Sequence, residues 1–167
     1  IDIQTSKAWI NILETLGIIF LLHPYSNNVL KRTIKTPKVY FYDTGLVCYL
    51  TRWSSPEVAE SGAMSGALLE NYTVSEIMKS YQNAGLEPYL YFYRDRDAKE
   101  IDVILEGDGK LCPLEIKKTA TPDKRLTRVF KVIDKSPLQL GTGAVLCMAD
   151  KFSAFDSNNL IVPIWMI

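Results

Sequence analysis

The stretch Lys99-Glu-Ile-Asp-Val-Ile-Leu-Glu-Gly-Asp-Gly-Lys-Leu-Cys-Pro-Leu-Glu-Ile-Lys117 predicts a β-hairpin. Turn-forming residues occupy positions 107–110, and apolar residues alternate along the chain on both sides of them. If Glu106 pairs with Leu111 across a four-residue loop, the register of the whole hairpin follows, because side chains alternate between the two faces. The hairpin is therefore the part of the chain from which the fold can be predicted.

The predicted register places two carboxylates opposite each other. Directly opposed Cβ atoms in an antiparallel pair lie roughly 5 Å apart, so like charges there destabilise the sheet. A slip of one residue would instead place Asp102 opposite Leu114 and separate the acids onto different faces. The predicted pairs are Leu105 with Cys112, Val103 with Leu114 and Ile101 with Ile116 on the apolar face, and Asp102 with Glu115 and Glu100 with Lys117 on the other.

A divalent cation would offset the repulsion between Asp102 and Glu115. Mg²⁺ binds through one or two carboxylates, and waters or substrate phosphates complete its shell. Lys117 lies two residues after Glu115 and so adds positive charge on the same face, where it can orient a water or stabilise charge on a phosphate. From this stretch alone, a surface hairpin with a solvated charged face is an equally good interpretation.

Composition indicates an ordinary globular protein. The chain has 167 residues, of which 47% are hydrophobic and 23% charged, which suffices for one domain plus a small appendage. Nineteen basic and nineteen acidic residues cancel, so nucleic-acid binding would need a local basic patch. The three cysteines form no CxxC pair and indicate free thiols in a reducing compartment. No apolar run approaches the roughly 18 residues of a membrane span, so we predict a cytoplasmic protein without membrane contact.

The first 55 residues resemble the end of a winged helix. A helix is expected over about 7–16, followed by strands at 18–22 and 38–42. Basic residues near the expected wing could contact phosphates, although a solvated face is the commoner interpretation; they are Lys31, Arg32, Lys35 and Lys38. The chain begins within a folded element without Met, which suggests a fragment of a longer protein. We place a boundary near residue 55 and predict a second unit over 56–167.

The second unit is predicted to be α/β, with a mixed β-sheet flanked by helices in the order αβββαββ. A helix over 61–81 carries Glu70 on the same stripe as Val74 and Ile77. A buried acid must be paired, neutral or near a cation, unless it reaches solvent at the edge of the stripe. An aromatic strand ending at Arg94 precedes the hairpin, and an amphipathic α-helix over 123–135 and two further strands, 143–148 and 160–165, follow it.

This order of elements resembles the restriction-endonuclease-like nucleases with the PD-(D/E)xK motif, and the matching positions are Glu70, Asp102, Glu115 and Lys117. Longer segments resemble the C-terminal domain of unknown function that follows the AAA+ ATPase module in a large bacterial and archaeal family. These segments are Lys38-Val-Tyr-Phe-Tyr-Asp-Thr-Gly-Leu46, Gly66-Ala-Leu-Leu-Glu-Asn71, Tyr93-Arg94, Glu100-Ile-Asp102 and Pro113-Leu-Glu-Ile-Lys117. The resemblance implies an ATPase module upstream. The chain itself has no G-x-x-x-x-G-K-[ST] loop, so we do not expect it to bind ATP.

The resemblance also implies a nucleic-acid phosphodiesterase that depends on Mg²⁺ or Mn²⁺. In this hypothesis Asp102 and Glu115 hold the metal, Glu70 completes or tunes its shell, and Lys117 positions water or stabilises phosphate charge. Arg94 would contact a phosphate, although a structural salt bridge is the commoner role of such an arginine. A second hypothesis is a non-catalytic nuclease-like module that binds nucleic acid, a protein or its own ATPase. A third is an unrelated α/β regulatory domain, in which the four residues would lie apart.

Overall fold

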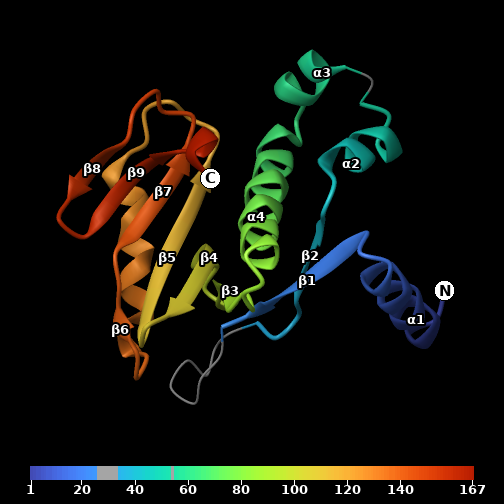
Figure 1. Ribbon diagram of the computed structural model, residues 1–167, viewed down its shortest axis with the longest axis horizontal. Coiled ribbons are helices and arrows are strands. Elements are labelled where there is room, and N and C mark those ends of the chain that lie inside the picture. Colours follow the sequence, from blue (N-terminus) through green and yellow to red (C-terminus); the bar gives the residue numbers. More distant parts are fainter. Residues whose placement is uncertain (26–33, 54) are drawn as a thin grey trace.

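The chain forms a mixed α/β structure around a single mixed sheet. The computed structural model describes residues 1–25, 34–53 and 55–167 (Figure 1). Within these residues the sheet has nine strands in the order β2-β1-β3-β4-β5-β7-β9-β8, and β6 pairs with β5 off this path. The helices are α1 (Ile3–Thr15), α2 (Thr44–Leu50), α3 (Pro56–Ser61), α4 (Ser65–Asn83) and the 3₁₀ helices η1 (Lys124–Lys135) and η2 (Ile164–Met166). The strands are β1 (Ile19–Pro24), β2 (Lys38–Phe41), β3 (Leu90–Arg94), β4 (Glu100–Gly107), β5 (Lys110–Lys117), β6 (Gln139–Leu140), β7 (Gly143–Cys147), β8 (Ser153–Asp156) and β9 (Asn159–Pro163).

The helix and two strands predicted in the first 55 residues are confirmed as α1, β1 and β2. Asp2 begins α1 by accepting a hydrogen bond from the Thr5 amide at 2.9 Å, which adds a turn before the predicted start. β1 and β2 pair antiparallel, and β1 also pairs parallel with β3. This segment therefore extends the sheet of the second unit. The division at residue 55 and the winged-helix origin stay predictions, and Lys31 and Arg32 lie outside the described residues.

The hairpin has the predicted register over most of its length. Glu106 pairs with Leu111, Leu105 with Cys112 and Val103 with Leu114. The turn places Asp108 and Gly109 at positive φ, 49° and 71°. β5 then connects through η1 to β7, which pairs with β5 in parallel, as expected of a crossover connection.

The turn gives a direct test of the register. Gly109→Ala should cost about 1 kcal/mol in the free energy of unfolding, because the left-handed backbone region penalises a Cβ atom. Gly107→Ala is the matched control, since Gly107 does not have a positive φ and an added Cβ would meet no atom within 4 Å. Urea denaturation of both variants measures the difference, and equal stabilities would contradict the assigned turn.

A β-bulge in β4 turns the first residues of this strand to the opposite faces of the sheet from those predicted. β3 pairs Tyr91 with Ile104 but Tyr93 with Ile101, so the single residue Phe92 lies opposite both Asp102 and Val103. The extra residue reverses the alternation. Ile101 consequently packs in a different core cluster from Val103, and the predicted placement of Ile101 on the same face as Ile116 is wrong.

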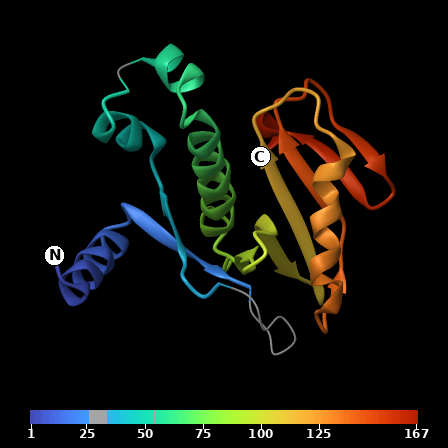
Figure 2. The ribbon, with the colours of Figure 1, turned by 180° about the vertical axis from the view of Figure 1, so that it is seen from behind.

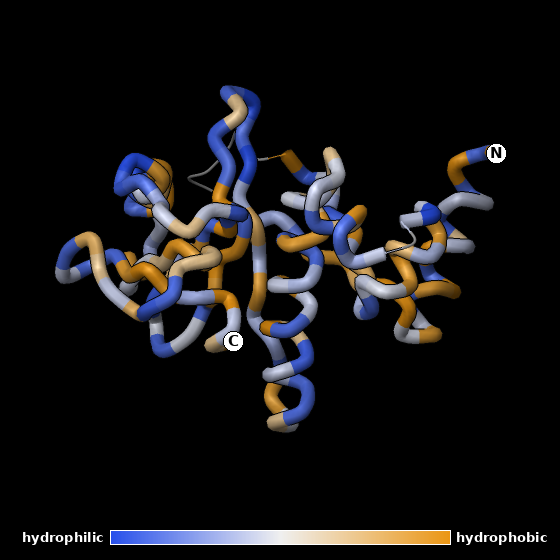
Figure 3. Tube along the Cα trace, turned by 90° about the horizontal axis from the view of Figure 1, so that it is seen from above, coloured by the Kyte–Doolittle hydropathy of each residue, from blue (hydrophilic) through white to orange (hydrophobic). Residues whose placement is uncertain are grey.

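The sheet has an apolar core on each face. One core joins α4 to the central strands, with Val74 and Ile77 packing in the same cluster as Leu114 and Ile116. The other core joins η1 to the opposite face through Phe130 and Ile133, together with residues that include Ile101. η1 lies behind the sheet in Figure 1 and in front of it in Figure 2. Figure 3 shows that hydrophobic and hydrophilic segments alternate along the whole chain, including its N-terminal end.

The helix predicted over 123–135 is a 3₁₀ helix instead of an α-helix. Along η1 the burial of the side chains repeats every third residue: 127, 130 and 133 are buried, 126, 129 and 132 are half-buried, and 125, 128, 131 and 134 are exposed. Side chains three apart eclipse in a 3₁₀ helix, so a sequence with this period packs one complete row into the core. An α-helix would rotate the same residues away from each other.

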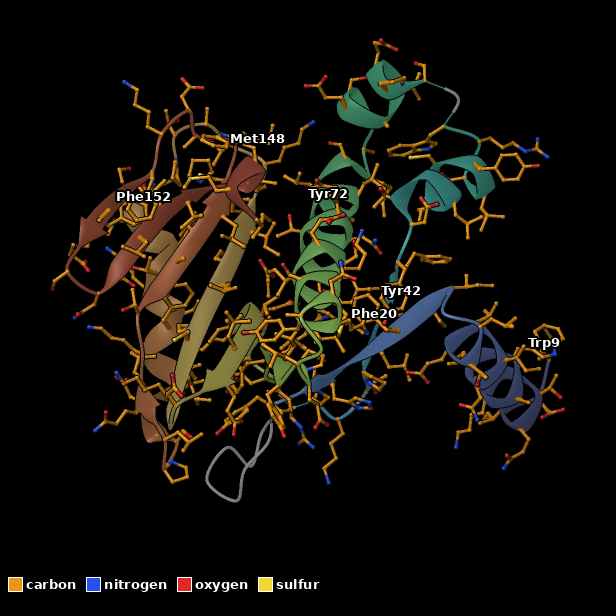
Figure 4. All side chains as sticks on the ribbon, viewed as in Figure 1. Trp9, Phe20, Tyr42, Tyr72, Met148 and Phe152 are labelled. Carbon is orange, nitrogen blue, oxygen red and sulfur yellow. The ribbon has the colours of Figure 1, made fainter. Side chains whose placement is uncertain are left out.

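α1 is an exposed helix at one end of the described structure. It buries none of its residues, and Trp9, Ile12 and Leu16 are all exposed. Figure 4 shows Trp9 projecting from this helix at one end of the molecule.

Candidate functional site

The bulge in β4 determines where the Asp102 carboxylate lies. Asp102 Oδ2 accepts a hydrogen bond from the backbone amide of Ile116 at 2.8 Å, so the side chain reaches across to β5. Regular pairing between β4 and β5 extends only as far as Val103 and Leu114. Asp102 thus takes the place of a backbone acceptor where the two strands separate, beside the predicted partner residue Glu115.

Asp102 and Glu115 form a buried acidic pair. They are 7% and 8% exposed. Burial raises the pKa of Asp102 to about 7, and the negative charges of Glu115 and then Glu70 act in the same direction. The Ile116 amide and the charge of Lys38 oppose this shift. Burial also raises the pKa of Glu115, against the effect of Lys117. The two buried acids would therefore stabilise a positive charge placed beside them.

Lys117 lies next to this pair, as predicted. Its Nζ is 2.9 Å from Glu115 Oε1, and its side chain is 46% exposed. Burial lowers the pKa of Lys117, but the hydrogen bond and charge of Glu115 outweigh it and raise the pKa overall. The ammonium group is therefore charged, partly accessible and held at the edge of the acidic pair.

Glu70 is fixed by two residues of β2. Its Oε1 accepts a hydrogen bond from Lys38 Nζ at 3.0 Å and from the Tyr40 hydroxyl at 2.5 Å. Lys38 Nζ also lies 2.6 Å from Glu100 Oε1 and 5.4 Å from the centre of the Phe92 ring. Glu70 is therefore paired with a lysine ammonium group, which is one of the outcomes expected for a half-buried acid.

Sequence reasoning missed the role of Lys38 and Tyr40. Lys38 was noted as one of the basic residues near the expected wing, and both residues lie in the segment 38–46 that carries the family resemblance, but neither was assigned a role in the site. Both side chains leave β2 on the same face, because they are two residues apart in a strand. Burial, followed by the charge and hydrogen bond of Glu70, raises the pKa of Tyr40, which keeps its hydroxyl protonated and donating. A basic and a phenolic residue at i and i+2 of a predicted strand was the available signal.

The arrangement offers a metal ion two carboxylates instead of three. Among the described residues, no group of three or more His, Cys, Asp or Glu side chains is placed to hold a metal. Glu70, predicted to complete the shell, is bound to Lys38 and Tyr40. Within the described residues, Asp102 Oδ1 and Glu115 Oε2 accept no hydrogen bond. Two such oxygens, with waters, fit a hard divalent cation.

Arg94 lies at the edge of this cluster. Its Nε is 3.7 Å from Glu100 Oε2, and the side chain is half exposed. The salt bridge expected as the commoner role of this arginine is therefore present, and a contact with phosphate stays a prediction.

Comparison with protein families identifies the chain. The model of a domain of unknown function, DUF4143, matches residues 65–167. The chain belongs to the DUF4143 family. A second domain of unknown function, DUF8612, matches residues 1–57. All five predicted site residues, Arg94 included, lie in the DUF4143 segment, whereas Lys38 and Tyr40 lie in the DUF8612 segment. The group of charged side chains around Asp102 and Glu115 is thus assembled from both matched segments.

Two curated relatives extend well beyond the chain. An uncharacterized protein of Mycobacterium bovis and one of Mycobacterium tuberculosis are each 29% identical over 160 residues. The matches cover 95% of this DUF4143 chain but 34% of either relative, so the chain spans about a third of their length. No solved structure matches it significantly. None of the described helices is long and apolar enough to cross a membrane, and a cytoplasmic location stays a prediction.

Proposed function

We propose that this DUF4143 chain is a nuclease-like module that cleaves phosphodiester bonds of nucleic acid with Mg²⁺ or Mn²⁺. The observation that carries the proposal is the buried pair Asp102 and Glu115, with Lys117 2.9 Å from the second acid. Buried carboxylates with raised pKa values, grouped around an accessible cation, are characteristic of functional sites. The order α4, β3, β4, β5, η1, β7, β9 supports a restriction-endonuclease-like fold, which is part of the proposal.

Each residue of the cluster has a distinct role in this proposal. Asp102 and Glu115 would hold the cation through the oxygens that accept no hydrogen bond from the protein, and a bound divalent cation supplies Lewis-acid stabilisation of phosphate charge. Lys117, which is partly exposed, orients a water or neutralises a non-bridging phosphate oxygen. Glu70 positions Lys38, whose charge lowers the pKa of Asp102 and so favours its ionised, metal-binding form.

The proposal extends to the longer protein. An AAA+ ATPase module upstream is the proposed partner, in line with the family resemblance of the chain. Relatives about three times as long as the matched segment leave room for such a module. The absence of a phosphate-loop motif from this sequence is compatible with ATP binding elsewhere in the protein.

A metal titration tests the site. Mn²⁺ should bind the chain saturably in calorimetry at pH 8, and Asp102→Asn or Glu115→Gln should abolish the heat. Asp108→Asn, in the turn of the same hairpin, is the matched control and should bind like the wild type, since its carboxylate lies outside the pair. Lys117→Met should retain Mn²⁺ binding. Absence of saturable binding by the wild type would contradict the proposed site.

Cleavage is tested separately with plasmid and single-stranded substrates. The wild type with Mn²⁺ should cut them, and Lys117→Met should not.

A second candidate function is a nuclease-like module that binds without cutting. The observation that favours it is the fixation of Glu70 by Lys38 and Tyr40, which leaves two carboxylates for a metal. Saturable Mn²⁺ binding without cleavage would support this candidate over the first.

A further inference from the structure

The 3₁₀ helix η1 presents a straight row of cations on the face that turns away from the core. Arg125, Arg128 and Lys131 occupy every third position and are all exposed. Three residues complete one turn of a 3₁₀ helix at a rise of roughly 2 Å each, so neighbouring members of the row stand about 6 Å apart along its axis. Consecutive phosphates along one strand of nucleic acid have a separation of the same order.

The row lines one wall of a groove. A cavity of about 590 Å³ lies between η1, the Gly141–Gly143 loop and the turn between β8 and β9, where Asn158 and Asn159 line it. Lys124 at the start of η1 forms an ion pair of 2.9 Å with Asp156, the residue that begins this turn. Asp156 Oδ1 also accepts hydrogen bonds from the Asn158 amide and the Asn159 side chain. The ion pair therefore links η1 to the turn between β8 and β9, on the two sides of the groove.

All three cations can contact a ligand, because Arg125, the one that is paired, has guanidinium N–H groups beyond that pair. Arg125 is paired with Asp123, at 2.7 Å. Arg128 and Lys131 form no hydrogen bond or ion pair within the described part of the chain. Asp134 occupies the next position of the row and ends the positive stretch. The groove thus has a positive section of limited length, flanked by amide groups that can donate to phosphate oxygens.

We propose that Arg125, Arg128 and Lys131 bind the phosphodiester backbone of one nucleic-acid strand along η1. The overall charge of the chain is zero, so such binding depends on this local row and not on a general positive field. Regular spacing along a line distinguishes the row from scattered surface lysines. The row lies on η1 and does not involve Asp102 or Glu115, so the inference goes beyond the proposed cleavage and does not depend on it.

Fluorescence anisotropy with a labelled single strand of 20 thymidines tests the row, in EDTA so that the metal site does not contribute. The triple variant Arg125→Gln, Arg128→Gln and Lys131→Gln should bind at least tenfold more weakly than the wild type. Each phosphate contact contributes about 0.7 to the slope of log affinity against log salt for single strands, so the slope should shrink by about 2.

The matched control removes the same charge elsewhere. Lys7→Gln, Arg52→Gln and Lys151→Gln change three exposed residues outside η1 and should leave both affinity and salt slope near the wild-type values. Equal losses in the two triple variants, or no loss in the η1 variant, would overturn the proposal. A poly-glutamate peptide of equal charge should bind the wild type at least tenfold more weakly than the thymidine strand. Equal affinity would overturn the assignment to phosphodiesters. Circular dichroism verifies that each variant is folded.

Discussion

Asp102→Asn is expected to raise the free energy of unfolding at pH 8 by on the order of 3 kcal/mol, while it abolishes Mn²⁺ binding. Folding places the carboxyl group of Asp102 in a buried position beside Glu115, where its pKa rises from 3.8 to about 7. Every tenfold loss of acidity on folding lowers the stability of the ionised protein by about 1.4 kcal/mol. The amide of asparagine is neutral, and its oxygen can still accept the Ile116 hydrogen bond.

The sign of the pH dependence follows from proton binding. Between pH 4 and 7 the folded state binds more protons at Asp102 than the unfolded state does, so wild-type stability falls as the pH rises through this window. Below about pH 4 the group is protonated in both states, and the wild type and Asp102→Asn should be similar in stability. The difference between them should therefore grow from pH 4 to pH 7 and level off above it.

Urea denaturation at pH 4, 6 and 8 in EDTA measures this difference. Asp108→Asn is the control, because Asp108 is an exposed residue of the turn and asparagine also tolerates its positive φ. A variant at 102 that is less stable than the wild type at pH 8 would show that the carboxylate is compensated in the folded protein. The environment described for Asp102 would then be wrong.

Local sequence patterns predicted the hairpin because turn chemistry and alternation act within a few residues. Glu106, Leu105 and Val103 have the predicted partners for this reason. The bulge at Asp102 could not be predicted from the same pattern, since it arises from the pairing of β4 with β3, a strand on its other side. That bulge, together with the bond to Ile116, sets the position of the Asp102 carboxylate. The element and its register were predictable, but the exact placement of the acid was not.

The straight alignment of the positive row on η1 depends on the helical period, which was predicted wrongly. At 3.6 residues per turn, each of Arg125, Arg128 and Lys131 is rotated by about 60° from the one before, so the three form an oblique band and not a straight row. In a 3₁₀ helix they align, and the buried residues Thr127, Phe130 and Ile133 align on another side. The sequence itself shows a repeat of three, because a basic residue followed by an apolar one recurs at 125–126, 128–129 and 131–132. Long 3₁₀ helices are uncommon, so an α-helix was the default interpretation.

Lys38→Met is expected to destabilise the chain by about 2 kcal/mol at pH 8. Lys38 Nζ lies 3.0 Å from Glu70 and 2.6 Å from Glu100, and all three side chains are less than one third exposed. Removing one partner of a buried ion pair leaves uncompensated charge and costs more than the pair itself contributes, and partial exposure moderates that cost here. The pKa of Asp102 should also rise further, because the charge of Lys38 lowers it in the wild type.

A double-mutant cycle separates this effect from lost packing of the lysine side chain. Adding Glu70→Gln to Lys38→Met removes one of the charges left without a partner, so the double variant should be more stable than Lys38→Met alone. Lys79→Met is the matched control. Lys79 pairs with Glu76 at 2.5 Å on the surface of α4, where such a pair contributes at most about 1 kcal/mol. Additive effects of the two substitutions would contradict a coupled cluster.

Lys38→Met also distinguishes two ways in which the acids can be neutralised, by the lysine ammonium group or by a metal ion. In Lys38→Met, Glu70 and Glu100 lose their shared ammonium group, while Asp102 and Glu115 remain in place. Added Mn²⁺ should then stabilise this variant more than the wild type, because the release of the Glu70 carboxylate should outweigh the further rise in the pKa of Asp102. A cation that binds only the folded state shifts the unfolding equilibrium in proportion to its affinity. Stabilisation equal to that of the wild type would mean that Lys38 does not compete with a metal for Glu70. Melting temperatures with and without roughly 1 mM Mn²⁺ measure the difference, since the stabilisation grows with the ratio of free metal to its dissociation constant.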